Sequence, residues 1–173
     1  MRDRRRSQGQ LIVQIAIISD THLPRGSRAL PAGCVERLTA ADLIVHAGDF
    51  STVDVLEELR AINRVVAVHG NVDEDRVRAV LPETAVVPAG DHRIAVVHDA
   101  GPAGGRLRRL RGRFPEADAV IFGHSHIPLY ERAADGFQIF NPGSPTDRRR
   151  QPHHTMGVCQ AGRRLQFRLI ELD

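Results

Sequence analysis

The sequence has little cysteine, no lysine and no long apolar run, and two of these shortages limit what the chain can be. Its two cysteines, Cys34 and Cys159, lie far apart and form neither a disulfide framework nor a cysteine-rich metal motif. That pattern is typical of a reducing cytosol. No stretch approaches the roughly 20 apolar residues that a membrane-spanning helix needs. We therefore expect a cytoplasmic protein that does not contact membranes.

The absence of lysine leaves all 24 basic residues as arginine, and the net charge is +3. Four arginines and one aspartate in the first ten residues account for this excess. The body of the chain is therefore neutral, which makes nucleic acid an improbable partner. We predict a disordered basic tail at residues 1–10. Residues 11–173 are long enough for one domain with its own core.

Short apolar runs alternate with amphipathic stretches over the first two-thirds of the chain. This pattern is typical of buried parallel strands joined by helices. The predicted strands cover residues 11–18, 43–47, 65–68, 94–97 and 120–122, and the predicted helices follow residues 31, 52 and 73 and cover residues 103–113. In the last third, apolar residues alternate around Asp135–Gly136 and Ala161–Gly162, which predicts antiparallel hairpins.

Two helices carry details that a structure can test. Ser51 or Thr52 is expected to cap the helix that follows it. Val77, Val80 and Leu81 are expected to form the buried stripe of the next helix.

Two arginine-rich segments have alternative interpretations. In residues 103–113 the arginines crowd one helix face, which is either a solvated face or an electropositive rim for an anionic substrate or partner. The Arg148–Arg150 run is expected in an exposed loop, which could border a cleft.

Five strand ends carry polar side chains that offer oxygen or nitrogen donor atoms. These residues are Asp20 and His22, Asp49, Asn71, His98, and His124 and His126. Because the carboxyl ends of strands in an open α/β sheet gather at one edge, we expect these side chains to lie together. Seven oxygen and nitrogen donors are too many for one tetrahedral ion, but they suit two divalent ions that share a carboxylate. Such donors favour Mn²⁺, Fe²⁺, Zn²⁺ or Ni²⁺, and two such ions can drive a displacement at phosphorus.

The ordered motifs resemble those of the calcineurin-like metallophosphoesterase superfamily. They are Asp20-x-His22, Gly48-Asp49, Gly70-Asn71, His98 and Gly123-His124-x-His126. The short chain and the segment Asn141-Pro142-Gly143-Ser144 resemble its small single-domain bacterial and archaeal phosphodiesterase branch, over roughly residues 13–150. The resemblance implies an α/β fold, a four-layer α/β/β/α sandwich of two mixed β-sheets flanked by helices.

The resemblance also implies a role for each motif residue. Asp20, His22 and His126 would bind the first metal, and Asn71, His98 and His124 would bind the second. Asp49 would bridge the two ions, for which Mn²⁺ is the first choice and Ni²⁺, Fe²⁺ or Zn²⁺ the alternatives. A hydroxide between the metals would attack the phosphorus of a small phosphoester. Asp49, His124 and Asn71 are the residues expected to be catalytic.

Three neighbouring positions modify this picture. Val72 stands where many family members have a histidine and cannot transfer a proton, which predicts a preference for activated diesters. Asp73 could orient groups behind the ligands or cap the helix after it. Asp99 places an extra carboxylate beside His98, near the second metal.

The other polar candidates are assigned no chemistry of their own. His46 and His69 follow buried strands and are expected to be packed structural histidines. His92, His153 and His154 are expected in loops. For the segment at residues 141–144 there are two alternatives: Asn141 and Ser144 hydrogen-bond near the site, or Pro142–Gly143 only makes a turn. We favour the turn, with Asn141 as the residue that could still reach the site.

Two other functions compete with a hydrolase. The retromer subunit with this fold is a precedent for a scaffold that has lost catalysis, and a DNA-repair branch is a precedent for a nuclease. The complete set of seven ligand positions favours the enzyme over the scaffold. The short, neutral chain argues against the nuclease. Antiparallel edges in the last third could pair between two copies, so a homo-oligomer is one option.

Overall fold

The computed structural model describes residues 6–7 and 10–173. The predicted tail falls mainly outside these residues. Within it, β1 (Arg6–Ser7) and β2 (Gln10–Leu11) pair as two short antiparallel strands. Among the described residues, no helix is both long and apolar enough to cross a membrane.

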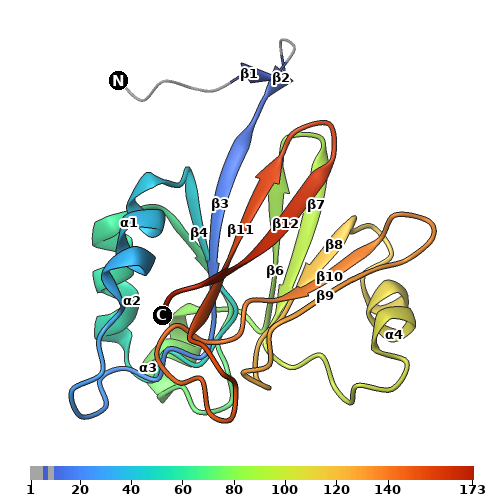
Figure 1. Ribbon diagram of the computed structural model, residues 1–173. Coiled ribbons are helices and arrows are strands. Elements are labelled where there is room, and N and C mark those ends of the chain that lie inside the picture. The colour runs from blue at the N-terminus through green and yellow to red at the C-terminus, as the bar shows by residue number, and fades with distance from the viewer. Residues whose placement is uncertain (1–5, 8–9) are drawn as a thin grey trace.

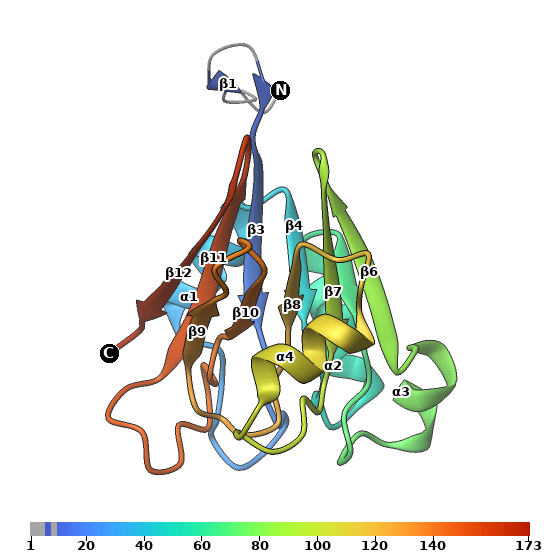
Figure 2. The same cartoon turned by 90° about the vertical axis from the view of Figure 1, so that its right-hand side faces the viewer.

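Two five-stranded sheets pack face to face, and helices cover their outer faces (Figures 1 and 2). The first sheet has the order β12-β11-β3-β4-β5, with β3 (Val13–Ile18), β4 (Leu43–His46), β5 (Val65–Ala67), β11 (Thr155–Ala161) and β12 (Leu165–Glu171). The second has the order β6-β7-β8-β10-β9, with β6 (Thr84–Ala89), β7 (His92–Val97), β8 (Ala119–Ile121), β9 (Leu129–Arg132) and β10 (Gln138–Asn141). The helices are α1 (Ala32–Ala40), α2 (Val53–Ile62), α3 (Asp75–Val80) and α4 (Arg106–Arg113).

The apolar residues form three clusters, one between each pair of adjacent layers. In β3, Ile15 and Ile17 face the other sheet, whereas Ala16 and Ile18 face α1 and α2. Successive residues of a strand point to opposite faces, so a strand covered on both sides is apolar at every position. A third cluster joins the second sheet to α4. The predicted four-layer sandwich is confirmed.

Both predicted hairpins are confirmed, as β9–β10 and β11–β12. The sequence analysis missed β6, which pairs antiparallel with β7 at the sheet edge. Its residues are mostly exposed or half-buried and include Pro88, which an edge strand tolerates because one side of its backbone needs no partner. The change from parallel to antiparallel pairing therefore begins earlier in the chain than predicted.

Two helix predictions are confirmed only in part. Thr52 occupies the N-cap position of α2, but its side chain makes no capping hydrogen bond. The Glu74 carboxylate accepts the backbone N–H of Val53 at 2.9 Å instead. Within α3 only Val77 is buried, and Val80 is 54% exposed. Leu81, just after the helix, is half-buried against the same cluster as Val77.

Candidate metal centre

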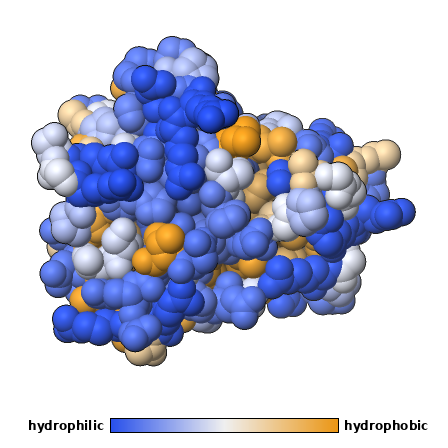
Figure 3. Space-filling model, turned by 90° about the horizontal axis from the view of Figure 1, so that it is seen from below, coloured by the Kyte–Doolittle hydropathy of each residue, from blue (hydrophilic) through white to orange (hydrophobic). Residues whose placement is uncertain are grey.

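All seven predicted donors follow strands that end at the same edge of the sandwich, the lower edge in Figure 1. Strands β3, β4 and β5 of the first sheet lead to Asp20 and His22, Asp49, and Asn71, and strands β7 and β8 of the second lead to His98 and to His124 and His126. Figure 3 views the molecule from this edge, where hydrophilic residues predominate. The structure therefore gathers residues from both sheets, as the order of motifs predicted.

The first group consists of Asp20, His22 and His126, whose donor atoms lie within 4.8 Å of one another. Nε2 of His126 is 3.1 Å from Nε2 of His22 and 3.5 Å from Oδ1 of Asp20. All three side chains are buried. This group therefore offers one oxygen and two nitrogen donors that are shielded from solvent.

The second group consists of Asp49, His98 and His124, again within 4.8 Å. Asn71 completes it, because its Oδ1 is 3.0 Å from Nε2 of His98 and 2.9 Å from Nδ1 of His124. Asn71 and His124 are exposed, so this group opens to solvent. The structure thus brings together the residues that the resemblance assigned to a second metal, together with Asp49.

Asp49 lies between the two groups. Its Oδ2 is 3.3 Å from Nε2 of His98 and 3.8 Å from Nε2 of His22. These contacts put one carboxylate within reach of both sets of donors.

The donor geometry suits divalent ions. Ligand atoms about 2.1 Å from a common ion are about 3.0–3.4 Å apart in octahedral or tetrahedral geometry. Two rings are also fixed from behind, since Nδ1 of His126 donates to the Asp147 carbonyl at 2.6 Å and Nδ1 of His98 to the Ala47 carbonyl at 2.7 Å. Each of these rings then turns its free Nε2 toward the cluster, as metal-binding histidines do.

The electrostatics of the first group also suit a cation. Burial raises the pKa of Asp20 to about 7, so its carboxylate needs compensating positive charge at neutral pH. Burial lowers the pKa of His22 and of His126. The rings are therefore held in the neutral form, which is the form that binds metals.

In the second group, Asp49 and His98 each shift the pKa of the other toward the charged form. For His98, burial opposes the charged ring, but the contact with Asp49 outweighs it and raises the pKa. For Asp49, burial opposes ionisation, and the contacts with His98 and the Val72 N–H reverse this and lower the pKa of the carboxyl. The carboxylate is thus ionised, as a bridging ligand must be.

Five of the seven donors have a left-handed backbone. Their φ values are 57° for Asp20, 45° for His22, 61° for Asp49, 69° for His124 and 58° for His126. This region costs a residue with a Cβ roughly 1–2 kcal/mol, and such residues concentrate at functional sites.

Glycine precedes several donors because the strand ends crowd together. A Cβ on Gly70 would overlap the Asp49 side chain, and a Cβ on Gly123 would lie 2.7 Å from Oδ2 of Asp20. Gly123 is not required by its backbone conformation. Its φ is not positive, and the close approach of Ser19 and Asp20 is the physical reason for it.

Asp73 anchors the loops of the second group. Its carboxylate accepts the backbone N–H groups of Asp49 at 3.0 Å, Ser51 at 2.8 Å and Gly70 at 2.6 Å. The N-cap of α3 is Glu74. Of the two roles considered for Asp73, the structure supports the one in which it orients the ligand loops.

Of the supporting hydroxyl groups, Ser144 was considered in the sequence analysis, whereas Ser19 and Thr146 were missed. The Ser144 and Thr146 hydroxyls donate to the carbonyls of Asp20 and Thr21, at 2.8 and 2.6 Å. The Ser19 hydroxyl donates to Oδ2 of Asp20 at 2.7 Å. The Ser144 contact supports the alternative in which the Asn141–Ser144 segment hydrogen-bonds near the site.

The other polar candidates support the site or lie beside it. His46 is fully buried, stacks on Phe50 at 3.6 Å and hydrogen-bonds to the Thr21 hydroxyl, as a structural histidine. Asn141 donates to the Gly123 carbonyl at 3.0 Å. Asp99 is exposed and accepts a backbone N–H of its own turn, two residues on.

Most arginines of α4 bind neighbouring groups of the protein. Arg106 and Arg109 donate to carbonyls of the preceding loop, and Arg113 pairs with Glu83 at 3.6 Å. The helix face is therefore neither simply solvated nor a free basic rim.

Comparison with known proteins gives consistent results. The family model described as the calcineurin-like phosphoesterase superfamily domain matches residues 13–163. A probable metallophosphoesterase of Methanocaldococcus jannaschii is 37% identical over 135 residues, which cover 76% of this chain and 68% of that protein. A phosphodiesterase of the same organism is 26% identical over 145 residues, covering 76% and 83%. The structure of Vacuolar Protein Sorting 29 from Cryptosporidium parvum has a TM-score of 0.81 at 21% identity, covering 94% and 92%, which shows a shared fold.

Proposed function

Because this chain belongs to the calcineurin-like phosphoesterase superfamily, we propose that it is a phosphodiesterase or phosphatase that hydrolyses a small phosphoester with two divalent metal ions. The observation that carries the proposal is the pair of donor groups with Asp49 between them. The phosphodiesterase name of one relative agrees with this chemistry.

Each group would hold one ion, with Asp49 shared between them. Two ions in these positions would supply an activated water and the positive charge that a displacement at phosphorus requires. Asn71 and His124 are the exposed donors, so the substrate would approach from their side. Mn²⁺ is our first choice among Mn²⁺, Ni²⁺, Fe²⁺ and Zn²⁺, all of which accept carboxylate, amide and imidazole ligands.

The position after Asn71 limits the choice of substrate. The Val72 side chain is 50% exposed and has no transferable proton, while its N–H donates to Oδ1 of Asp49 at 3.0 Å. This residue therefore helps to hold Asp49 and offers no proton to a leaving group. Esters whose leaving group is a stable anion are the expected substrates.

The test is hydrolysis of bis-p-nitrophenyl phosphate by chelator-stripped protein before and after Mn²⁺ is added. Activity should require metal. Asp49→Asn should remove activity while the protein remains folded. Asp54→Asn, an exposed position on α2, should leave activity unchanged. Full activity in Asp49→Asn would refute the role of Asp49.

A scaffold is the second candidate, because the fold neighbour with a TM-score of 0.81 bears a protein-sorting name. The same assay separates the two. A folded protein that is inactive with all four metals would favour the scaffold, and the next step would be a search for a protein partner.

A further inference from the structure

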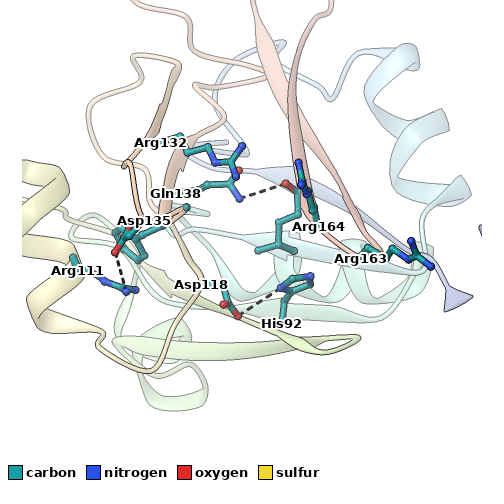
Figure 4. Close-up of a pocket in the computed structure, with 11 residues that line it drawn as sticks. His92, Arg111, Asp118, Arg132, Asp135, Gln138, Arg163 and Arg164 are labelled. Atoms are coloured by element: carbon teal, nitrogen blue, oxygen red, sulfur yellow. Dashed lines mark hydrogen bonds and ion pairs between the residues drawn. The ribbon is translucent and has the colours of Figure 1, made fainter.

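A second cluster of charged side chains lies at the opposite end of the sandwich. Figure 4 shows this pocket, which has walls from both sheets. His92, which was expected in a loop, begins β7 here, whereas His98 follows the same strand at the candidate metal centre. Six steps along an extended strand span about 20 Å. The pocket is therefore separate from the metal centre.

Both carboxylates in the pocket are already engaged. Oδ2 of Asp135 is 3.0 Å from Nη2 of Arg111, and its Oδ1 accepts the Phe137 N–H at 3.0 Å. Oδ2 of Asp118 accepts a backbone N–H of β7 at 2.8 Å and lies 3.7 Å from Nδ1 of His92. The negative charges are thus matched within the pocket wall.

Three arginines that line the pocket have no such partner for their side chains. Arg132 ends β9, and Arg163 and Arg164 lie in the turn between β11 and β12. Their guanidinium groups make no ion pair or hydrogen bond with any residue that the structure describes. In Figure 4, Arg132 and Arg164 lie on the same side of the pocket near Gln138, and Arg163 points away. Four arginines and two aspartates leave the lining with a net charge of +2.

The turn that carries Arg164 is fixed from the second sheet. Nε2 of His92 donates to the Gly162 carbonyl at 3.1 Å, and the Gln138 amide donates to the Leu165 carbonyl at 3.3 Å. Gln138 is 5% exposed, so this second contact is buried. The backbone of Arg164 therefore needs little ordering when a ligand binds, which favours affinity.

The size of the pocket restricts its ligand. Its volume is about 170 Å³, and a water molecule in the liquid takes about 30 Å³. A phosphoryl group fits such a space, and the rest of a larger ligand would lie outside it. Guanidinium groups bind phosphate oxygens through pairs of parallel hydrogen bonds. We propose that this pocket binds the phosphoryl group of a small anion, through Arg132 and Arg164. Inorganic phosphate and a small phosphate monoester share this chemistry.

The test is a titration of the full-length protein with inorganic phosphate and, separately, with glycerol phosphate. The side-chain ¹H–¹⁵N signals of the arginines are followed at constant ionic strength. Two arginine signals should shift and saturate, and the Arg132→Ala/Arg164→Ala variant should lack both and bind at least tenfold more weakly. The Arg76→Ala/Arg168→Ala variant loses the same charge at exposed positions outside the pocket and should bind as the wild type does.

Each outcome decides the proposal. If either anion gives the expected shifts, the pocket is established, and the tighter-binding anion identifies the source of the phosphoryl group. If neither anion gives saturating shifts of these two signals, or if the control variant is weakened equally, the proposal is wrong. The pocket does not depend on the proposed hydrolase, so Asp49→Asn should retain this binding.

Discussion

Asp73 allows the sharpest test of how the second donor group is held. Its buried carboxylate accepts three backbone N–H groups, from Asp49, Ser51 and Gly70. Hydrogen bonds to a charged group contribute about 1.5–3 kcal/mol each, and a donor left unpaired in the interior adds a penalty. Replacing this residue should therefore lower the free energy of unfolding far more than a surface substitution would.

The two substitutions differ in how many acceptors survive. Asp73→Asn keeps one oxygen, which can still serve the Asp49 and Gly70 N–H groups, but its NH₂ group then faces the Ser51 N–H. We expect a loss of about 2–3 kcal/mol for this variant. Asp73→Ala removes all three bonds and should lose about 4 kcal/mol or more. The order of the two values is part of the prediction.

Urea denaturation with excess chelator measures these losses without a contribution from bound metal. Asp75→Asn is the matched control, because Asp75 is exposed in the first turn of α3 and should change stability by less than about 1 kcal/mol. If Asp73→Asn were as stable as the control, the three hydrogen bonds would not hold the loops together.

Three further predictions concern metal, thiols and packing. Free Mn²⁺ at 100 times its dissociation constant should raise the unfolding free energy by about 2.7 kcal/mol for each site that it fills. Denaturation of the wild type with and without Mn²⁺ tests this, and an equal gain in Asp49→Asn would contradict the shared carboxylate. Burial raises the pKa of Cys34 and of Cys159 to about 12, so only about one thiol in ten thousand is ionised at pH 8. A disulfide reagent should therefore react with both cysteines only after denaturation. Rapid reaction of the native protein would show that they are accessible. A Cβ on Gly157 would lie 2.7 Å from Cζ of Phe140, so Gly157→Ala should destabilise the protein by about 1–3 kcal/mol. Gly162→Ala is the control, because the atom nearest to the added Cβ would be 3.7 Å away. This variant should be nearly as stable as the wild type in the same assay.

The donors could be predicted from the sequence because each follows a short apolar strand directly. A buried parallel strand is apolar at every position, so a polar pair such as Asp20 and His22 immediately after it is conspicuous. The fold followed from the same motifs through the family resemblance. These two parts of the sequence analysis needed only local patterns.

Supporting roles for Asp73 and Ser144 could be proposed from the sequence, but their hydrogen-bond partners could not be predicted, since these contacts join residues far apart in the chain. The Ser144 hydroxyl reaches the Asp20 carbonyl across 124 residues, and Asp73 reaches the Asp49 loop across 24. The edge strand β6 lacked the apolar alternation that identifies a strand. The cytoplasmic location, the metal and the oligomeric state remain predictions.

The left-handed donors have a consequence for how this chain would respond to selection for stability alone. Glycine relieves the backbone energy at such positions, yet it carries no donor atom. A scan of all substitutions for folding without metal should therefore favour glycine most at His22 and His124. At Asp20, Asp49 and His126 the gain is offset by lost side-chain hydrogen bonds to the backbone groups of His124, Val72 and Asp147. The substitutions that favour folding would then differ from the residues of this sequence, and these differences would lie along one edge of the sandwich. A map of these differences would locate the functional edge without any knowledge of its chemistry.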